Sequence, residues 1–327
     1  MKAAQAFAGR TLRNLPQGEA VQQILAAALA AVEPGAAVRG SLRWAEGALW
    51  VGQRPYASRD FDRVWLVSVG KAALAMAGAA AEVVGECLHG GLIITKHAQV
   101  SQLAGLPVLC GGHPLPNAHS LEAGQRVAAL LAPLGARDLV LCCISGGGSA
   151  LMTLPQADIA LEDVQALTAN LLACGANIAE MNLLRRRLDG LKAGGLARWA
   201  APATVVGLIL SDVVGDALHA IASGPTAPDP TTVEQVRDVL TRYGLEEQLA
   251  PAMRRALLEG AETPKPGDML FDRVQNVVVG SNLLAAQATL RQAAELGLQP
   301  YLLRVDVQGE ARQAGVELAQ VLRWAAL

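Results

Sequence analysis

The chain has 327 residues, of which 52% are hydrophobic, 17% charged and only 3% aromatic, and its formal net charge is −2. This length and apolar content predict a large aliphatic core, divided between two domains, and the charge balance argues against nucleic-acid binding. The sequence contains no run of about 18 apolar residues, so it predicts no membrane span. The N-terminal stretch lacks the apolar core of a signal peptide.

Short apolar runs alternate with helical patterns along the chain. The expected strands are 64–69, 91–95, 106–110, 138–145, 204–211, 276–281 and 299–305. The expected helices are 22–34, 71–85, 120–133, 161–174, 177–191, 233–243, 249–259, 282–296 and 310–326. Near-continuous apolar strands separated by helices are typical of a parallel sheet covered on both faces. We therefore expect an α/β protein with three layers, α/β/α, around a mostly parallel Rossmann-like sheet.

The stretch PKPGD, residues 264–268, has the composition of a linker. We expect residues 1–265 to form one α/β domain and residues 266–327 to begin a second α/β unit, which the chain does not complete. Ligands of such sheets bind beyond the carboxyl ends of the strands, so the loops that follow the strands are the candidates for a site.

The five cysteines include no CxxC pair, and two of them, Cys142 and Cys143, lie inside an apolar run. This pattern predicts buried, reduced thiols in a cytoplasmic protein. No second His or Cys at ligand spacing predicts a zinc site.

The strand at 138–145 runs directly into the loop SGGGSA, formed by Ser145, Gly146, Gly147, Gly148, Ser149 and Ala150. A strand, a glycine loop and a helix in this order present backbone N–H groups to an anion, and glycine lets a phosphate approach the backbone closely. The loop matches neither GxxxxGK[ST], nor GxGxxG, nor GxSxG. The alternative is a tight strand–helix turn without a ligand.

Two basic residues follow other strands. Lys71 stands at the start of a helix, where a cation opposes the helix dipole. It is either a tolerated exposed lysine or a group that holds an anion together with the helix N-terminus. His113, in GGHPLPN, is either a loop histidine or a residue that faces substrate or an anion.

Asp212 and Asp216, in LSDVVGD, come directly after a buried strand. Two carboxylates at the end of a strand suit Mg²⁺, which takes one or two carboxylates together with phosphate oxygens and water. The alternative is that Asp212 caps a helix and Asp216 lies on the surface. Ser223 and Thr226, a little further on, either line the same cleft or cap a helix.

The stretch NLLRRRLDGLKAGGLA predicts a helix that places Arg185 and Lys192 on neighbouring positions, while Arg186 and Arg187 diverge. One reading is a solvated basic helix face. The other is that Arg185 or Lys192 binds a carboxylate or a phosphate. Backbone donors, a lysine and a carboxylate-held metal are the parts that phosphoryl transfer needs, so the residues together predict an enzyme that handles a nucleotide or phosphate.

Several stretches, in order, resemble the class II glycerate kinases, a family also labelled hydroxypyruvate reductase. They are VGKAALAMA, GGHPLPN, ISGGGSALMTLP, RRRLDGLKAGGLA, LILSDVVGDALHAIASGPTAPDPTT and VVGSNLLAA, and the similarity runs over residues 15–315. The resemblance implies ATP-dependent phosphorylation of D-glycerate to 2-phosphoglycerate with Mg²⁺. It leaves the assembly state open, with a homodimer as one option.

The resemblance also implies roles for individual residues. Lys71, Arg185 and Asp212 are expected to be catalytic, and Asp212 and Asp216 to hold the metal. The expected nucleotide-binding residues are Ser145, Gly146, Gly147, Gly148, Ser149, Lys192, Ser281 and Asn282.

The chain departs from the family pattern at a few positions. Asn117 replaces an aspartate, Arg186 and Arg187 replace a lysine and a histidine, and Ala193 replaces a glycine. The family also carries a further C-terminal domain that this sequence does not include. Two alternative functions are a nicotinamide-dependent hydroxypyruvate reductase and a non-catalytic fragment that binds a phosphate ligand. The absence of GxGxxG argues against the reductase.

Overall fold

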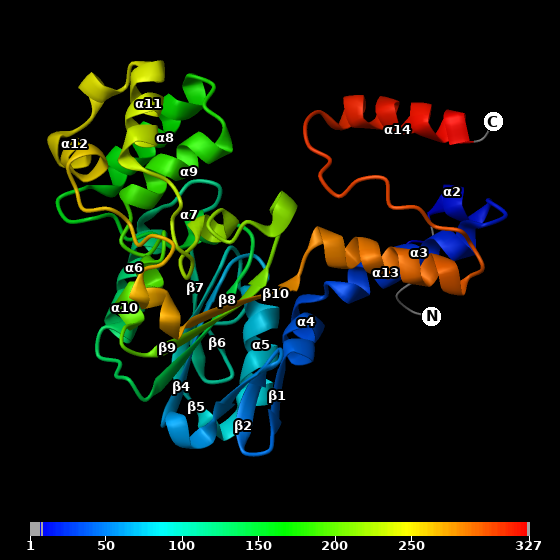
Figure 1. Cartoon of the computed structure of the whole chain (residues 1–327), viewed down its shortest axis with the longest axis horizontal. Coiled ribbons are helices and arrows are strands. Elements are labelled where there is room, and N and C mark those ends of the chain that lie inside the picture. The colour runs from blue at the N-terminus through cyan, green and yellow to red at the C-terminus, as the bar shows by residue number, and fades with distance from the viewer. Residues whose placement is uncertain (1–6, 8, 326–327) are drawn as a thin grey trace. The chain divides into compact units, whose positions relative to one another are not determined.

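A seven-stranded sheet organises the larger part of the chain in this computed structural model, which describes residues 7 and 9–325 (Figure 1). The strand order is β10-β9-β8-β4-β5-β7-β6, and only the pair β6–β7 is antiparallel. The strands are β4 (Arg63–Val69), β5 (Leu88–Thr95), β6 (Gln102–Leu103), β7 (Leu106–Cys110), β8 (Asp138–Ile144), β9 (Thr204–Leu210) and β10 (Val274–Gly280). The predicted α/β fold with a mostly parallel sheet is confirmed.

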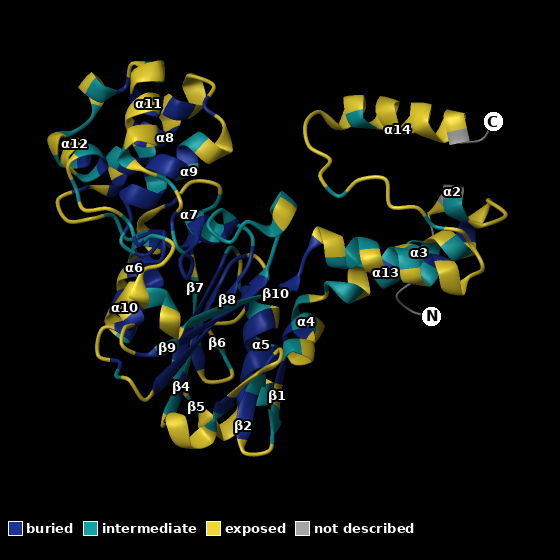
Figure 2. Ribbon diagram, in the orientation of Figure 1, coloured by how far each residue is buried: buried dark blue, intermediate teal, exposed yellow. Residues whose placement is uncertain are grey.

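Strand β8 is buried over its whole length and its neighbours β4 and β9 over most of theirs, as their continuous apolar sequences predict (Figure 2). Helix α5 (Ala73–Val84) packs on β4 and β5, α6 (Ala118–Leu131) on β7, and α10 (Gly195–Ala200) on β9. A helix and a small sheet that precede β4 in the chain were not expected from the sequence. They are α4 (Pro34–Ser41) and a small antiparallel sheet of β1 (Leu42–Ala45), β2 (Ala48–Val51) and β3 (Arg54–Ala57).

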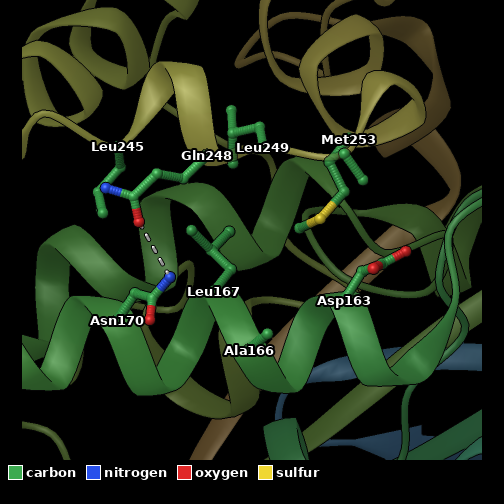
Figure 3. A pocket seen from close by; sticks show the side chains of 9 residues that line it. Asp163, Ala166, Leu167, Asn170, Leu245, Gln248, Leu249 and Met253 are labelled. Carbon is green, nitrogen blue, oxygen red and sulfur yellow. Dashed lines mark hydrogen bonds between the residues drawn. The ribbon is translucent and has the colours of Figure 1, made fainter.

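Four helices form a second hydrophobic core within the same unit. They are α8 (Leu161–Ala173), α9 (Ile178–Arg187), α11 (Val233–Tyr243) and α12 (Pro251–Leu258). A narrow crevice beside α8 is lined by Leu167, Leu245 and Met253, and Asn170 donates a hydrogen bond of 3.5 Å to Gln248 across it (Figure 3). Because apolar side chains dominate this crevice, we read it as a packing gap and not as a site.

Contacts divide the described chain into two units. The larger comprises Val32–Asp212 and Ala217–Gly280, and the smaller comprises Val213–Asp216 with the described parts of Met1–Ala31 and Ser281–Leu327. Strand β10 belongs to the large sheet, although it lies after position 265, where the sequence predicts a domain boundary. That boundary stays a prediction.

The smaller unit contains α2 (Arg10–Arg13), α3 (Gly18–Ala31), α13 (Asn282–Glu295) and α14 (Ala311–Ala325), and α3 packs against α13. The prediction of a strand at 299–305 is wrong, because this segment pairs with no strand and Tyr301 and Leu303 are exposed. No single helix of the described residues is long and apolar enough to cross a membrane, and α3 with α4 meets that test only as a bent pair.

Candidate functional site

The order of the strands reverses between β4 and β8. From β4 the chain adds β5 and β7 on one side, and from β8 it adds β9 and β10 on the other. In open parallel sheets the connections on either side of such a reversal leave a crevice at the carboxyl ends of the two strands, where ligands bind. The loops that meet there are Gly70–Lys71 after β4 and SGGGSA after β8.

Backbone hydrogen bonds fix these two loops to each other. Lys71 donates its backbone N–H to the carbonyl of Gly146 at 3.0 Å. Ala72 donates to the Ser145 hydroxyl oxygen at 3.1 Å. Ser145 is buried and its hydroxyl also reaches the carbonyl of Val69 at 3.4 Å. Ser145 therefore holds the loops together, and its predicted contact with a nucleotide stays a prediction.

The glycine loop leaves backbone donors free. Gly147 adopts φ +87°, a left-handed conformation that turns the chain into the four-residue helix α7 (Gly148–Leu151). Within the described part of the chain, the backbone N–H groups of Gly146, Gly147 and Ser149 have no acceptor. Buried backbone donors are nearly always paired, so three free donors in one partly exposed loop are available to an anion.

Polar side chains from three loops surround the two glycines. A Cβ atom placed on Gly147 would lie 3.2 Å from Nε2 of His113 and 3.3 Å from Cε of Lys71. A Cβ atom placed on Gly146 would lie 2.1 Å from Oδ2 of Asp212. The structure thus brings together Lys71, His113 and Asp212, which follow β4, β7 and β9. Glycine is required at both positions because neighbouring side chains occupy the space that a Cβ atom would fill.

His113 lies in an electropositive environment. Burial lowers its pKa below the ordinary value of 6.5, and the positive charges of Lys71 and Lys96 lower this pKa further. The carboxylate of Asp212 acts in the opposite direction but does not reverse the shift. The imidazole is therefore neutral at pH 7, and the net charge beside the glycine loop comes from the two lysines and Asp212.

A small pocket adjoins the loop at Ser149. Its polar lining residues are Ser149, Thr153, Arg185, Asp189 and Lys192. The hydroxyl of Ser149 is 2.8 Å from that of Ser223, a buried residue at φ +62°. The structure therefore brings Arg185 and Lys192 together with Ser149 at the end of the SGGGSA loop. The roles that the resemblance implies for them stay predictions.

The reading of a solvated basic helix face is wrong for Arg186 and Arg187, because both side chains are buried. Nε of Arg186 lies 3.2 Å from Oδ1 of Asp229, and Nη1 of Arg187 donates to Oε2 of Glu262 at 2.8 Å. Their partners are distant in the sequence, which is why the pattern of the helix alone did not indicate the burial.

The other departures from the family pattern also have local structural roles. Asn117 caps α6 by accepting from the backbone N–H of Ser120 at 3.0 Å, and it accepts from Gly112 at 3.1 Å. Ala193 adopts φ +52° and donates its backbone N–H to Ser223 at 2.9 Å. An asparagine is thus sufficient at position 117, whereas Ala193 occupies a conformation that favours glycine.

The remaining predicted residues belong to the smaller unit. Ser281 caps α13 by accepting from the backbone N–H of Leu284 at 3.4 Å, and Asn282 donates to the carbonyl of Val305 at 3.2 Å. Asp216 stands in a 3₁₀ turn at φ +53°. The predicted nucleotide contacts of Ser281 and Asn282, and the metal contact of Asp216, stay predictions.

No group of three or more His, Cys, Asp or Glu side chains among the described residues is arranged to hold a metal ion. A Mg²⁺ site completed by phosphate oxygens needs fewer protein ligands than this. Asp212 is exposed beside the glycine loop, so its carboxylate is available to a cation.

Sequence reasoning missed two contributors to this region. Asp189 accepts hydrogen bonds from the hydroxyl of Thr153 and the ammonium group of Lys192. The positive charge of Lys96 lowers the pKa of His113. The spacing of Asp189 and Lys192, three residues apart, was a signal that the two could pair. No local signal joins Lys96 to His113, because they follow different strands.

Comparison with known proteins gives several matches. A family described as a domain of unknown function, DUF4147, matches residues 20–258. The chain is 38% identical to the D-glycerate 2-kinase of Thermotoga maritima, over 81% of this chain and 62% of that protein. It is 35% identical to an Agrobacterium vitis protein provisionally named hydroxypyruvate reductase, over 95% of this chain and 67% of that protein.

A solved structure agrees with these matches. The crystal structure of glycerate kinase from T. maritima superposes with a TM-score of 0.80 at 35% sequence identity, and the match covers 93% of this chain and 69% of that chain. The chain therefore spans 62% of the T. maritima kinase sequence and 67% of the A. vitis protein.

Proposed function

The chain belongs to the class II glycerate kinase family, and from this premise we propose that it transfers the γ-phosphoryl group of ATP to D-glycerate. The oxygen of the 2-hydroxyl group forms a bond to the γ-phosphorus while the bond to the bridging oxygen breaks. The hydroxyl proton is released, and 2-phosphoglycerate and ADP leave. The relatives named D-glycerate 2-kinase and glycerate kinase support this assignment.

One observation carries the nucleotide part of the proposal. The backbone N–H groups of Gly146, Gly147 and Ser149 have no acceptor among the described residues, and they lie at the point where the strand order reverses, beside Lys71. In the proposed complex these donors bind phosphate oxygens, and Lys71 offsets the negative charge of the transferred group. Fixed donors of this kind need no reorganisation during the reaction, which is why they lower the barrier.

Mg²⁺ fits the donor set of this region. Asp212 supplies a hard carboxylate oxygen next to the loop. A role for Asp216 as a further ligand stays a prediction. When bound, the ion neutralises charge on the phosphate oxygens. The carboxylate of Asp212 lies against Gly146, where the absence of a side chain leaves room for it.

Cys142 and Cys143 are buried and form no disulfide, which fits a cytoplasmic setting for the reaction.

The first experiment measures binding and product together. The purified chain is titrated calorimetrically with a non-hydrolysable ATP analogue plus Mg²⁺, then with D-glycerate, and ADP release is followed with ATP. We expect the analogue to bind and D-glycerate to stimulate ADP release. Oxidation of NADH or NADPH by hydroxypyruvate, without ADP release, would instead support the reductase. Nucleotide binding without turnover would support a fragment that only binds ligand.

A further inference from the structure

A second groove of the larger unit is lined by α9, α11 and the segment around His219 (Figure 1). Its volume is about 370 Å³, within the range of small-molecule sites. The buried side chains of Leu183 and Val239 give it an apolar floor. Among the described residues that line it, none is expected to be catalytic, to hold a metal or to bind the nucleotide. The groove is therefore not part of the proposed phosphate site.

Contacts at both ends of the groove set the direction of the two helices. At one end, Glu180 of α9 accepts from Nη1 of Arg242 at 2.5 Å and from the hydroxyl of Tyr243 at 3.0 Å, near the end of α11. At the other end, Arg186 of α9 pairs with Asp229, which precedes α11 in the chain. The two helices are therefore antiparallel and form the two walls of the groove.

Arg186 brings a free donor to one wall. Its side chain is buried, its Nε atom lies 3.2 Å from Oδ1 of Asp229, and its Nη1 atom donates to the carbonyl of His219 at 3.3 Å. Its Nη2 atom has no acceptor in the described part of the chain and, unlike Nε, is not fully enclosed by protein. Leaving a donor of a buried guanidinium unpaired is costly. Because Arg186 lines the groove, this donor suits an acceptor oxygen of a ligand.

Asp238 brings an opposite charge to the facing wall. Its side chain lines the groove, is exposed and forms no ion pair among the described residues. Measured from the pair of Glu180 and Arg242, Asp238 lies about 6 Å and Arg186 about 9 Å along the helices, at a rise of about 1.5 Å per residue. The two groups thus stand on opposite walls with an offset of only about 3 Å along the groove.

The charges around the groove favour a ligand that carries both signs. Its two arginines are offset by Asp229, Glu180 and Asp238, so an excess of one negative charge remains. The imidazole of His219 adds no charge at pH 7, because burial and the charge of Arg186 lower its pKa against the opposing effect of Asp229. A simple anion is repelled by Asp238, and a simple cation is repelled by Arg186.

We propose that this groove binds a small α-amino acid with an aliphatic side chain. The carboxylate of the ligand accepts from Arg186, its ammonium group donates to Asp238, and its side chain packs on Leu183 and Val239. Both charged groups of an α-amino acid are attached to one carbon, which suits two walls with an offset of about 3 Å. The inference does not rest on the proposed kinase function, because it uses none of the residues of that site.

The first test separates the two charges of the ligand. The purified chain is titrated calorimetrically with glycine, L-alanine and L-valine, with 3-methylbutanoate (the skeleton of valine without the ammonium group) and with isobutylamine (the same skeleton without the carboxylate). We expect L-valine to bind, and each analogue to bind about tenfold or more weakly, because each loses a charge-assisted hydrogen bond. Equal affinity for L-valine and either analogue would overturn the proposal, as would no binding of any of the three amino acids.

The second test changes the two walls separately. Asp238→Asn should lower the affinity for L-valine about tenfold without lowering that for 3-methylbutanoate. Arg186→Lys keeps a charge beside Asp229 but lacks the guanidinium fork, so it should weaken both ligands. The control is Glu234→Gln, which removes an exposed carboxylate of α11 that does not line the groove, and it should behave as the unchanged chain.

Unchanged L-valine affinity in Asp238→Asn would overturn the assignment, and this exposed site keeps the test valid if Arg186→Lys does not fold. Circular dichroism checks the fold of each variant. Failure of the kinase function reads differently, because ADP release from ATP and D-glycerate is measured on the same samples. If L-valine binds with the expected charge dependence but no ADP forms, the groove is supported and the proposed reaction is wrong.

Discussion

Gly146 and Asp212 face each other from the ends of the neighbouring strands β8 and β9, so closely that a Cβ atom on Gly146 would lie 2.1 Å from Oδ2 of Asp212. The contact joins the two features that the sequence singles out for phosphate chemistry, the glycine loop and the aspartate after β9. It also means that the position of the carboxylate depends on the absence of a side chain at residue 146.

The substitution Gly146→Ala tests this dependence. The methyl group should displace the Asp212 carboxylate while leaving the fold intact, because the clash is with the end of a flexible side chain. A displacement of about 1 Å at a reacting centre can lower turnover by about a hundredfold. The measurement is kcat/KM for D-glycerate and ATP in a double-mutant cycle with Asp212→Ala.

In the Asp212→Ala background, Gly146→Ala should have no further effect, because the carboxylate it displaces is gone. Two full, additive losses would show that Gly146 acts independently of Asp212 and would contradict the explanation.

The substitution Gly147→Ala is expected to weaken binding of the ATP analogue. Gly147 adopts φ +87°, and a Cβ atom there would crowd His113 and Lys71. A matched control is Gly175→Ala, at φ +77° with open space around it. Both substitutions force alanine into the left-handed region, which costs about 1–2 kcal/mol of folding stability. Only Gly147→Ala should reduce nucleotide affinity by calorimetry; an equal reduction in both variants would point to a general loss of folded protein.

The parallel core was predictable because its strands are continuously apolar, as in residues 139–144 of β8. The strands β1 to β3 were not, since each has only four residues, and β1 (LRWA) and β3 (RPYA) are of mixed polarity. Their pairing is antiparallel and is stabilised by contacts with α4 and α5, which local patterns do not reveal.

The same division holds for the site. The sequence indicated the loops that carry Lys71, Gly147 and Asp212, because chemistry in such folds follows the carboxyl ends of strands. It did not indicate that Ser149 meets Ser223, 74 residues further on, or that Lys192 is already neutralised inside the protein. These contacts depend on tertiary packing of segments whose own sequences are compatible with several arrangements.

The hairpin between β1 and β2 offers a test of stability alone. Glu46 and Gly47 form its two-residue turn at φ +55° and +72°, conformations that Asn-Gly adopts most readily. Glu46→Asn should therefore raise the free energy of unfolding by about 1 kcal/mol, measured by urea denaturation. Gly47→Ala, which meets no neighbouring atom, should lower it through backbone strain alone. A destabilising Glu46→Asn would contradict the assigned turn.

Glu262 should contribute an acid-sensitive part of the folding stability. Partial burial raises its pKa, but hydrogen bonds from Lys265 and Arg187 outweigh this and lower the pKa to about 2. Because the folded pKa lies below the ordinary value of 4.5, the stabilisation is complete above pH 4.5 and is lost as the pH falls toward 2.

The variant Glu262→Gln measures this contribution. It should destabilise the chain at pH 7 by about 2 kcal/mol, a value reduced by the solvent exposure of Glu262 and increased by the buried Arg187 that it leaves unpaired. The difference in unfolding free energy from the unchanged chain should shrink between pH 4.5 and 2. A difference that is constant across this range would contradict the ion-pair explanation, and Glu259→Gln, an exposed site, serves as the control.

His113 reports directly on the charges around the glycine loop. Its pKa is lowered by burial, then by Lys71 and Lys96, against an opposing effect of Asp212. Lys71→Met should therefore raise the pKa of His113 toward 6.5, whereas Asp212→Asn should lower it further. Nitrogen-detected NMR of the imidazole groups between pH 5 and 8 measures both shifts, with His113→Gln to assign the signal.

Because the unfolded chain takes up the proton first, the depressed pKa of His113 also predicts that folding stability falls as the pH drops below 6.5. A His113 pKa that does not respond to Lys71→Met would show that the lysine side chain points away from the loop, and the proposed contact of Lys71 with a bound phosphate would lose its support.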